Sequence, residues 1–339
     1  MTKTAAESTS LHNDAAAPSS EAVEPEIRAL FDPAGGAVFD QRNRLLNDAG
    51  PEEWEGLAFP VEFALELAAV CNLACVMCPV PTTSRPKKLM APEIFRRVID
   101  EVSNERGFVL LPQGFGESML HKQWADLVGY AVEHGIHPVV MLTNGMLLND
   151  ANIERLLALE IDALLVSIDG VDRETYAKVR VGGDLDRVEA NVRRFLELRG
   201  SRPLPHLVLR IIRMRETSAE IDQFFARWKP LLAAGDALQI NEYNDWAGKV
   251  EDHSIDGLDS SQSSRGPCRM LWRNLSVHAD GKVSACCLDS EDELIVGDLS
   301  RGDTIRNIWH GEALARLRRI HREGRFAELP ICQRCKNWY

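Results

Sequence analysis

From about residue 60, the chain alternates between apolar, β-rich runs and amphipathic helical patterns. The helical stretches 92–102 and 185–198 place their apolar residues on one stripe. The other runs are almost continuously apolar, as expected of parallel strands buried on both faces. Six β/α repeats within about 180 residues predict an α/β fold whose parallel sheet is open or curled into part of a barrel. The six predicted strands are 61–68, 108–113, 138–143, 163–169, 207–213 and 237–241.

Polar or reactive residues lie at the end of each predicted strand. In a parallel β/α fold, functional residues collect at the carboxyl ends of the strands. Each segment alone resembles an ordinary loop, since Gly, Asn and Asp favour turns. Their common position predicts one shared site on this rim. In strand order they are Cys71, Cys75 and Cys78, then GFGES (114–118), TNG (143–145), SIDG (167–170), Arg210 with Arg213, and NEYND (241–245).

The first rim segment carries three cysteines with the spacing C-x3-C-x2-C, at Cys71, Cys75 and Cys78. A [4Fe–4S] cluster is usually held by four thiolates, so three would leave one iron open to a cofactor. A zinc site completed by a distant His or Asp, or unreactive buried thiols, are the alternatives. The position directly after a buried strand favours the cluster.

The segment Cys71-Asn-Leu-Ala-Cys75-Val-Met-Cys78 resembles the signature of the radical SAM superfamily. In that family the open iron binds S-adenosylmethionine (SAM), and one electron splits SAM to a 5′-deoxyadenosyl radical that abstracts hydrogen from the substrate. The resemblance covers about residues 60–250. It implies a partial (β/α)6 TIM-like barrel, a [4Fe–4S] cluster on these three cysteines, and an electron donor such as flavodoxin or ferredoxin.

The same resemblance implies where SAM binds. Gly116-Glu117 is similar to the family's Gly-Gly-Glu motif, which contacts the SAM amino group, although Phe115 stands where the motif has its first glycine. Ser167 and Asp169 of SIDG match the position that contacts the SAM ribose. Asn144, on the same rim, is a further candidate for SAM binding.

Five further cysteines lie in the C-terminal part of the chain. The segment 275–287 alternates in polarity around Asp280-Gly281, which predicts a hairpin. A helix over 305–324 would then return the chain to the final CxxC. Four thiolates complete either a zinc site or a [4Fe–4S] cluster, and the spacing alone does not separate these. The cysteines in question are Cys268, Cys286, Cys287, Cys332 and Cys335.

The pattern Cys-x12-Gly-x4-Cys with a late CxxC resembles the SPASM or twitch extension of radical SAM enzymes, over residues 266–339. The short, twitch form implies one auxiliary [4Fe–4S] cluster on Cys268, Cys286, Cys332 and Cys335. Cys287 is then left without an assigned role. It could be a packing residue, a ligand that exchanges with Cys286, or a hydrogen-atom donor to a substrate radical. Neighbouring residues of a strand face opposite sides, so the two thiols are not expected to share the cluster.

Composition argues against a nucleic-acid-binding protein and against a membrane-spanning one. The net charge of −12 argues against nucleic acid as the main partner. No apolar run approaches the ~20 residues of a membrane helix, and the absence of an apolar N-terminal core predicts a cytoplasmic protein. The basic run 316–325 is expected to be the solvated face of a helix. The predicted domains are a largely disordered extension (1–58), the radical SAM core (59–250), a linker (251–266) and the twitch/SPASM-type domain (267–339).

A closed auxiliary cluster can accept an electron from a substrate radical, so we expect dehydrogenation of a hydroxylated small molecule such as a sugar or aminocyclitol. Polar rim residues would bind its hydroxyls or amines, and Glu242 or Asp245 would remove the hydroxyl proton. The alternatives are a ribosomal-peptide maturase, a redox-neutral epimerase using Cys287, and a non-catalytic Fe–S electron-transfer protein. The short segment before the barrel disfavours the N-terminal peptide-binding domain of many maturases. The rim residues are Arg210, Arg213, Glu242, Asn244 and Asp245.

Overall fold

The computed structural model describes residues 33–255 and 265–337. The first 32 residues, predicted as a disordered tail, lie outside the described residues. In the described part of the chain, two helices precede the sheet, α2 (Pro33–Asp48) and α3 (Pro51–Trp54). Both are packed onto the rest of the chain, so the second half of the predicted extension 1–58 is structured. Their buried apolar side chains are Phe39, Leu46 and Trp54.

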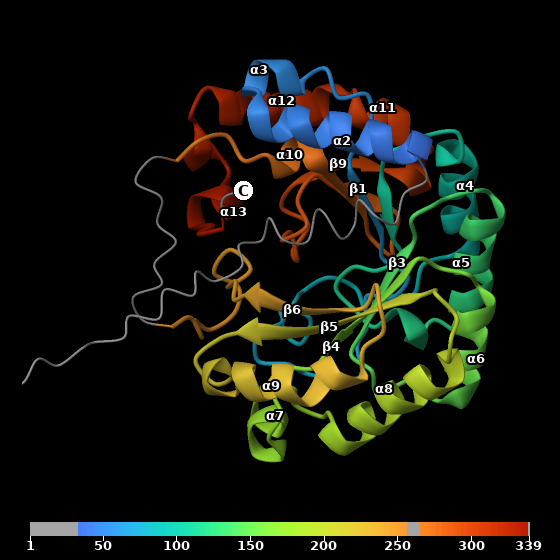
Figure 1. Cartoon of the computed structure of the whole chain (residues 1–339). Helices are drawn as coiled ribbons and strands as arrows, with labels where there is room; N and C mark the ends of the chain where they lie inside the picture. Colours follow the sequence, from blue (N-terminus) through green and yellow to red (C-terminus); the bar gives the residue numbers. More distant parts are fainter. Residues whose placement is uncertain (1–32, 256–264, 338–339) are drawn as a thin grey trace, which may run out of the picture.

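Six parallel strands form the centre of the fold and confirm the six predicted runs (Figure 1). β1 pairs with β2, and β3 to β6 pair in sequence order. A parallel bridge between Leu110 and Val139 joins β2 to β3. Within the described residues β6 does not pair with β1, so the strands form a partial barrel. The strands are β1 (Glu62–Leu65), β2 (Val109–Leu111), β3 (Val140–Thr143), β4 (Ala163–Ser167), β5 (His206–Arg213) and β6 (Ala237–Glu242).

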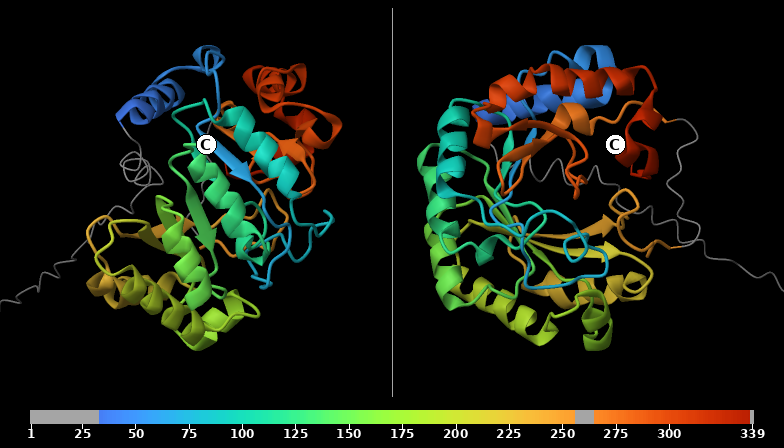
Figure 2. Two further views of the ribbon diagram at one scale, coloured as in Figure 1. Left: turned by 90° about the vertical axis from the view of Figure 1, so that its right-hand side faces the viewer. Right: turned by 180° about the vertical axis from the view of Figure 1, so that it is seen from behind.

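Helices between the strands form an arc on the outer side of the sheet (Figure 2, right). Side-chain caps mark where some begin: Asn149 accepts a hydrogen bond from the backbone N–H of Asn152, and Asp184 from that of Arg187. No helix in the described ranges is long and apolar enough to cross a bilayer. The helices are α4 (Pro92–Val102), α5 (Trp124–Glu133), α6 (Asp150–Ala158), α7 (Arg173–Val179), α8 (Leu185–Arg199) and α9 (Ile221–Trp228), with short 3-10 turns η2 (Ser118–Leu120), η3 (Ser218–Glu220) and η4 (Lys229–Leu231).

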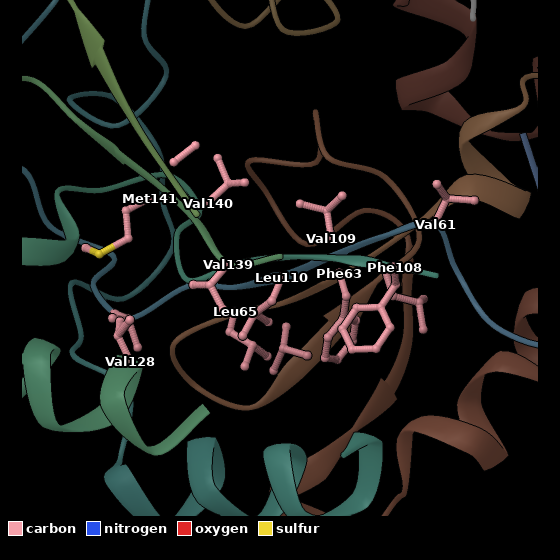
Figure 3. Close-up of a cluster of buried hydrophobic side chains, with 14 of the residues drawn as sticks. Val61, Phe63, Leu65, Phe108, Val109, Leu110, Val128, Val139, Val140 and Met141 are labelled. Carbon is pink, nitrogen blue, oxygen red and sulfur yellow. The ribbon is translucent and has the colours of Figure 1, made fainter. Parts of the chain in front are cut away.

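β1 contributes to a cluster of buried apolar side chains that also includes residues of β2 and β3 (Figure 3). Phe63 is fully buried, and its ring lies 6.3 Å from that of Phe108 and 5.9 Å from that of Phe59. Val139 and Met141, just before β3 and within it, are equally buried. Because β1 is held on both sides, the loop that follows it starts from a fixed position.

The C-terminal part continues the sheet on the other side of β1. β7 pairs with β1 in parallel, whereas β8 pairs antiparallel with β7 and with β9. The predicted hairpin is confirmed, and its turn uses Gly281 at a φ of 93°. Residues 256–264 of the predicted linker lie outside the described residues. The elements are α10 (Met270–Arg273), β7 (Asn274–Val277), β8 (Lys282–Ser284), β9 (Ile295–Asp298), η5 (Leu299–Arg301), α11 (Ile305–Trp309), α12 (Glu312–Arg322), η6 (Phe326–Glu328) and α13 (Pro330–Arg334).

The helix predicted over 305–324 is in fact two helices, separated at Gly311. Gly311 has an extended backbone, with φ of −80° and ψ of 159°, which ends the first helix and begins α12; a Cβ there would lie 2.6 Å from the carbonyl oxygen of Asn307. The basic run is not wholly solvated either. Arg318 is buried, with its guanidinium 4.4 Å from the centre of the Trp309 ring.

Glu66, directly after β1, is a buried carboxylate that joins three parts of the chain. It accepts hydrogen bonds from the backbone N–H of Phe115 at 3.0 Å and of Ala279 at 2.9 Å. It also forms an ion pair with the buried guanidinium of Arg85. A single side chain thus ties the cysteine loop, the segment after β2 and the C-terminal hairpin together.

We predict that Glu66→Gln lowers the free energy of unfolding by about 1–3 kcal/mol, because the amide cannot form the buried ion pair with Arg85, whose second partner, Asp292 at 3.1 Å, remains. The matched control is Glu174→Gln on α7, whose ion pair with Lys178 is exposed and should change stability by less than about 1 kcal/mol. Urea denaturation of the full chain, followed by fluorescence and circular dichroism, measures both. Equal effects of the two substitutions would show that Glu66 does not tie the parts together.

Candidate active site

The three-cysteine loop is held in place by the end of α7. The backbone N–H of Ala74 donates to the carbonyl of Val181 at 2.8 Å, and that of Val76 to Val179 at 3.0 Å. Two polar side chains approach the thiols: the Asn144 amide lies 3.7 Å from Cys71 Sγ, and the Arg180 guanidinium 3.7 Å from Cys75 Sγ. The segment after β3 and the end of α7 therefore supply hydrogen-bond donors to the thiols.

Burial raises the pKa of the thiols of Cys71 and Cys75, and raises the pKa of Cys78 to about 12. Arg180 acts in the opposite direction on all three, because its charge favours a thiolate. A raised pKa keeps these thiols protonated in the metal-free protein. Because a metal binds the thiolate form, metal binding would release protons.

The GFGES segment passes tightly against the start of the cysteine loop. A Cβ at Gly116 would lie 2.0 Å from the carbonyl oxygen of Ala68, so only glycine fits there. The next residue, Glu117, is buried; its backbone N–H donates to Val70 at 2.9 Å and its carboxylate accepts from the backbone N–H of Asn144 at 2.8 Å. Burial raises the pKa of Glu117. Glu117 thus positions Asn144 beside Cys71.

Phe115, in place of the motif's first glycine, packs away from this close approach. Its ring centre lies 5.4 Å from that of Trp246 and 5.3 Å from the guanidinium carbon of Arg85. The side chain therefore fills a space between the C-terminal part and the loop, and does not displace the backbone of Gly116.

The two predicted ribose contacts of SIDG differ in what their side chains do. Asp169 is fully buried: one oxygen accepts from Arg180 Nε at 2.7 Å and the other from the backbone N–H of Ile212 at 2.7 Å. Its carboxylate is engaged by the protein, so the arrangement gives no support to the prediction that Asp169 contacts SAM. Ser167 is half-buried and accepts a hydrogen bond from Arg210 at 3.0 Å.

Four of the C-terminal cysteines line one open cavity. All four predicted auxiliary ligands lie on its wall, and otherwise the wall is largely apolar. His321 also lines it and accepts a hydrogen bond from the backbone N–H of Cys268 at 3.2 Å. Its pKa is lowered to about 4 by burial and by Arg265, so it is neutral at physiological pH. The four thiols are those of Cys268, Cys286, Cys332 and Cys335.

Cys286 and Cys287 do not lie in a strand, because β8 ends at Ser284. The alternation argument used to separate their roles therefore does not apply. The cavity separates them instead, since Cys286 lines it and Cys287 does not. Burial raises the pKa of the Cys287 thiol to about 12.

The segment after β6 connects the two groups of cysteines. Trp246 Nε1 donates to the carbonyl oxygen of Met77, between Cys75 and Cys78, at 2.8 Å. The next residue, Ala247, lines the auxiliary cavity and accepts from Arg334 Nε at 3.3 Å. Trp246 and Ala247 both have left-handed φ angles, of 52° and 56°. Such angles are unfavourable for residues other than glycine, so the surrounding contacts hold this segment in place.

The two predicted bases lie in different surroundings. Glu242 is exposed and paired with Arg213 at 3.1 Å. Asp245 is buried, with one oxygen 3.6 Å from Lys336 Nζ. Its other oxygen, Oδ1, is buried and has no hydrogen-bond partner within the described ranges. Of the two, only Asp245 offers a buried acceptor.

Comparison with known families matches two models to the chain. The radical SAM superfamily model matches residues 65–226, and the SPASM model, an iron–sulfur cluster-binding domain, matches residues 268–336. The chain belongs to the radical SAM superfamily. The three-cysteine loop and the four-cysteine cavity fall in the two matched regions.

Among curated radical SAM proteins, the chain is 24% identical to the mycofactocin maturase MftC of Mycolicibacterium smegmatis over 318 residues, 84% of this chain and 79% of that protein. It is 34% identical to the AdoMet-dependent heme synthase of Methanosarcina barkeri over 135 residues, 39% of this chain and 38% of that protein. These relatives differ in activity, so they do not establish the reaction.

Solved structures show the same fold. BtrN in complex with AdoMet and 2-DOIA matches with a TM-score of 0.57 and 16% identity, over 82% of this chain and 94% of that chain. SuiB of Streptococcus suis bound to its precursor peptide SuiA matches with a TM-score of 0.60 and 13% identity, over 78% and 67%. At such identities the likeness supports the fold alone.

The family brings SAM and iron–sulfur clusters as cofactors, and the donor sets of this radical SAM enzyme fit them. Three thiols share one loop that also carries polar neighbours, whereas four thiols surround a mostly apolar cavity. Thiolates are the usual ligands of such clusters. Among the residues that the structure describes, no three His, Cys, Asp or Glu side chains are grouped closely enough to hold a single metal ion.

Sequence reasoning missed three contributors: Glu66, Arg180 and Trp246. Arg180 is an isolated arginine near the end of α7, and its contacts with Asp169 and Cys75 come from other elements. Glu66 looks like part of an apolar strand in the sequence, and only its partners reveal its role. Of the three, Trp246 was the one that the sequence could have indicated, because it is a large aromatic residue within an otherwise polar rim segment.

We predict that Cys286→Ser removes about four irons per chain, one cubane, while Cys287→Ser leaves iron content unchanged. The reason is that only Cys286 lines the cavity with the other three thiols. Iron and sulfide analysis after anaerobic reconstitution, with the absorption spectrum, measures both variants. Loss of iron in Cys287→Ser would overturn this assignment.

Proposed function

We propose that this radical SAM enzyme dehydrogenates a hydroxylated small molecule, such as a sugar or aminocyclitol, with the help of one auxiliary cluster. The observation that supports it is the grouping of four cysteines around one cavity, with Cys287 the single cysteine left over from eight. The remaining cysteine cannot complete a second closed auxiliary cluster. A protein with one closed cluster near its SAM site has one place for the electron that substrate oxidation releases.

Cys71, Cys75 and Cys78 would hold the cluster that supplies the electron for SAM cleavage, and Cys268, Cys286, Cys332 and Cys335 would hold a closed cluster able to accept an electron. The protein's own residues hold and screen the site. Asn144, positioned by Glu117, and Arg180, positioned by Asp169, both contact the thiols. We assign Gly116, Glu117, Asn144 and Ser167 to SAM binding.

We further propose Asp245 as the group that accepts the hydroxyl proton when the substrate is oxidised. Its Oδ1 is buried and has no partner among the described side chains, and it directly precedes Trp246, which contacts the cysteine loop. A buried carboxylate in reach of a substrate hydroxyl suits a general base. Glu242 is the weaker candidate, because it is exposed and already paired with Arg213.

A ribosomal-peptide maturase is the second candidate. The match to MftC over 84% of this chain favours it, as does the fold shared with SuiB, whose structure holds a precursor peptide. A peptide substrate would have to reach the same rim. The two candidates differ in the product: a ketone on a small molecule, or a mass change in a peptide.

We predict that anaerobically reconstituted protein binds about eight irons per chain, two cubanes, and forms 5′-deoxyadenosine from SAM under strong reduction. With an amino-sugar or cyclitol substrate, the organic product should lose two hydrogens per 5′-deoxyadenosine formed. Iron analysis and mass spectrometry measure these quantities. An electron donor such as flavodoxin or ferredoxin can replace the chemical reductant in a second assay.

Two results would contradict the proposal separately. Failure to form 5′-deoxyadenosine with both clusters loaded would contradict the proposal that the protein catalyses SAM cleavage. Formation of 5′-deoxyadenosine with modification of a precursor peptide, and none of any polyol, would favour the maturase. About four irons per chain would remove the auxiliary cluster alone.

A further inference from the structure

The inner face of β5 and β6 carries polar side chains that the cofactor assignment does not use. Leu207, Leu209 and Ile211 are fully buried under the helices. Because side chains alternate along a strand, Arg210 of β5 points to the opposite, inner face. Gln239 is its partner on β6.

Three polar residues form a row across neighbouring strands. Ser167 of β4 is the register partner of Arg210, and Arg210 is the partner of Gln239. Asn241, two residues beyond Gln239, lies on the same face of β6 and is the partner of Ile212. We name Arg210, Gln239 and Asn241 the inner polar row, which adjoins Ser167 of the predicted SAM site. With strands about 4.8 Å apart, the distance across the strands from Ser167 to Gln239 is about 10 Å.

The inner polar row has buried atoms without hydrogen-bond partners. Within the part of the chain that the structure describes, these are Arg210 Nε, Gln239 Oε1 and Asn241 Oδ1. Leaving such atoms unsatisfied is unfavourable, and buried polar groups in proteins are almost always hydrogen-bonded. Three of them on one face, beside the predicted ribose contact Ser167, are typical of a site that a polar ligand completes.

The charge of Arg210 and of the groups near it indicates which kind of ligand this face can bind. Arg210 has Asp169 in its electrostatic surroundings, but that carboxylate is engaged by Arg180 and the backbone of Ile212. Burial lowers the pKa of Arg210 to about 10, so it is still charged at neutral pH and donates hydrogen bonds. Its contact with Ser167 places it next to the predicted SAM site.

We propose that the inner polar row binds the hydroxyl groups of a neutral or amino-bearing polyol, held beside SAM. A hydroxyl both donates and accepts, so it can pair with the guanidinium and with either end of the Gln239 and Asn241 amides. A phosphate or carboxylate only accepts, and it would leave the amide oxygens unpaired. This inference rests on the proposed oxidation of a hydroxylated substrate and assigns the residues that select it.

The test measures binding to the full chain with both clusters reconstituted and SAM bound. The probes are myo-inositol, glucosamine and glucose, with triglycine as a peptide probe, observed by saturation-transfer NMR and titration. We expect at least one polyol to bind and triglycine to bind more weakly. Gln239→Leu and Asn241→Leu should each weaken polyol binding about tenfold, the loss expected for one buried hydrogen bond.

The matched control is Gln223→Leu, the same change on the exposed side of α9, which should alter polyol binding less than about twofold. The Kd for SAM should stay unchanged in all three variants, which also shows that they are folded. The inference is overturned if no polyol binds, if triglycine binds better, or if the two inner variants bind polyol like the control.

The outcomes separate this site from the proposed reaction. A polyol that binds through Gln239 and Asn241 but is not oxidised on reduction would contradict the dehydrogenation and leave the binding site standing. A polyol that is oxidised equally well by both variants would contradict the inner polar row and leave the dehydrogenation standing.

Discussion

The buried carboxylate of Glu66 is the interaction on which the arrangement of both sites depends. It stands directly after the central strand β1 and receives hydrogen bonds from Phe115, beside the predicted SAM motif, and from Ala279, in the C-terminal hairpin. Its charge is matched by Arg85 of the cysteine loop. A charge taken out of water is tolerated only with such partners. Because Glu66 would be unfavourable to bury without these partners, it favours the one conformation in which all three segments meet.

The topology explains why the two groups of cysteines are neighbours although about 190 residues separate Cys78 from Cys268. β1 pairs with β2 on one side and with β7 on the other, so the C-terminal part begins beside the strand that leads to the first cysteines. Trp246 and Ala247 then contact both regions from the far end of the barrel. An electron passing between the two sites would have this short, ordered segment on its way.

Features that depend on short-range sequence pattern could be predicted from the sequence. The six strands, the hairpin at Gly281 and the grouping of cysteines follow from apolar runs, turn residues and spacing. Contacts between residues far apart in sequence could not be predicted this way. Asp169 has the residue type of a ligand contact, and the structure adds that Arg180 and the backbone of Ile212 engage its carboxylate, while its contact with SAM stays a prediction. The break at Gly311 is a local feature that the pattern did not show, because a glycine within an amphipathic pattern is also compatible with a continuous helix.

The inner face of β5 shows how one strand separates stability from recognition. Its outward residues Leu207, Leu209 and Ile211 are fully buried and contribute the apolar area that holds the sheet to the helices. Its inward residue Arg210, with Gln239 and Asn241 on β6, leaves polar atoms unsatisfied, at a cost of about 1–3 kcal/mol each. Apolar residues at these three positions would make a more stable barrel. Local rules of packing are broken mainly at functional sites, so this polar face is best explained by a ligand that completes its hydrogen bonds.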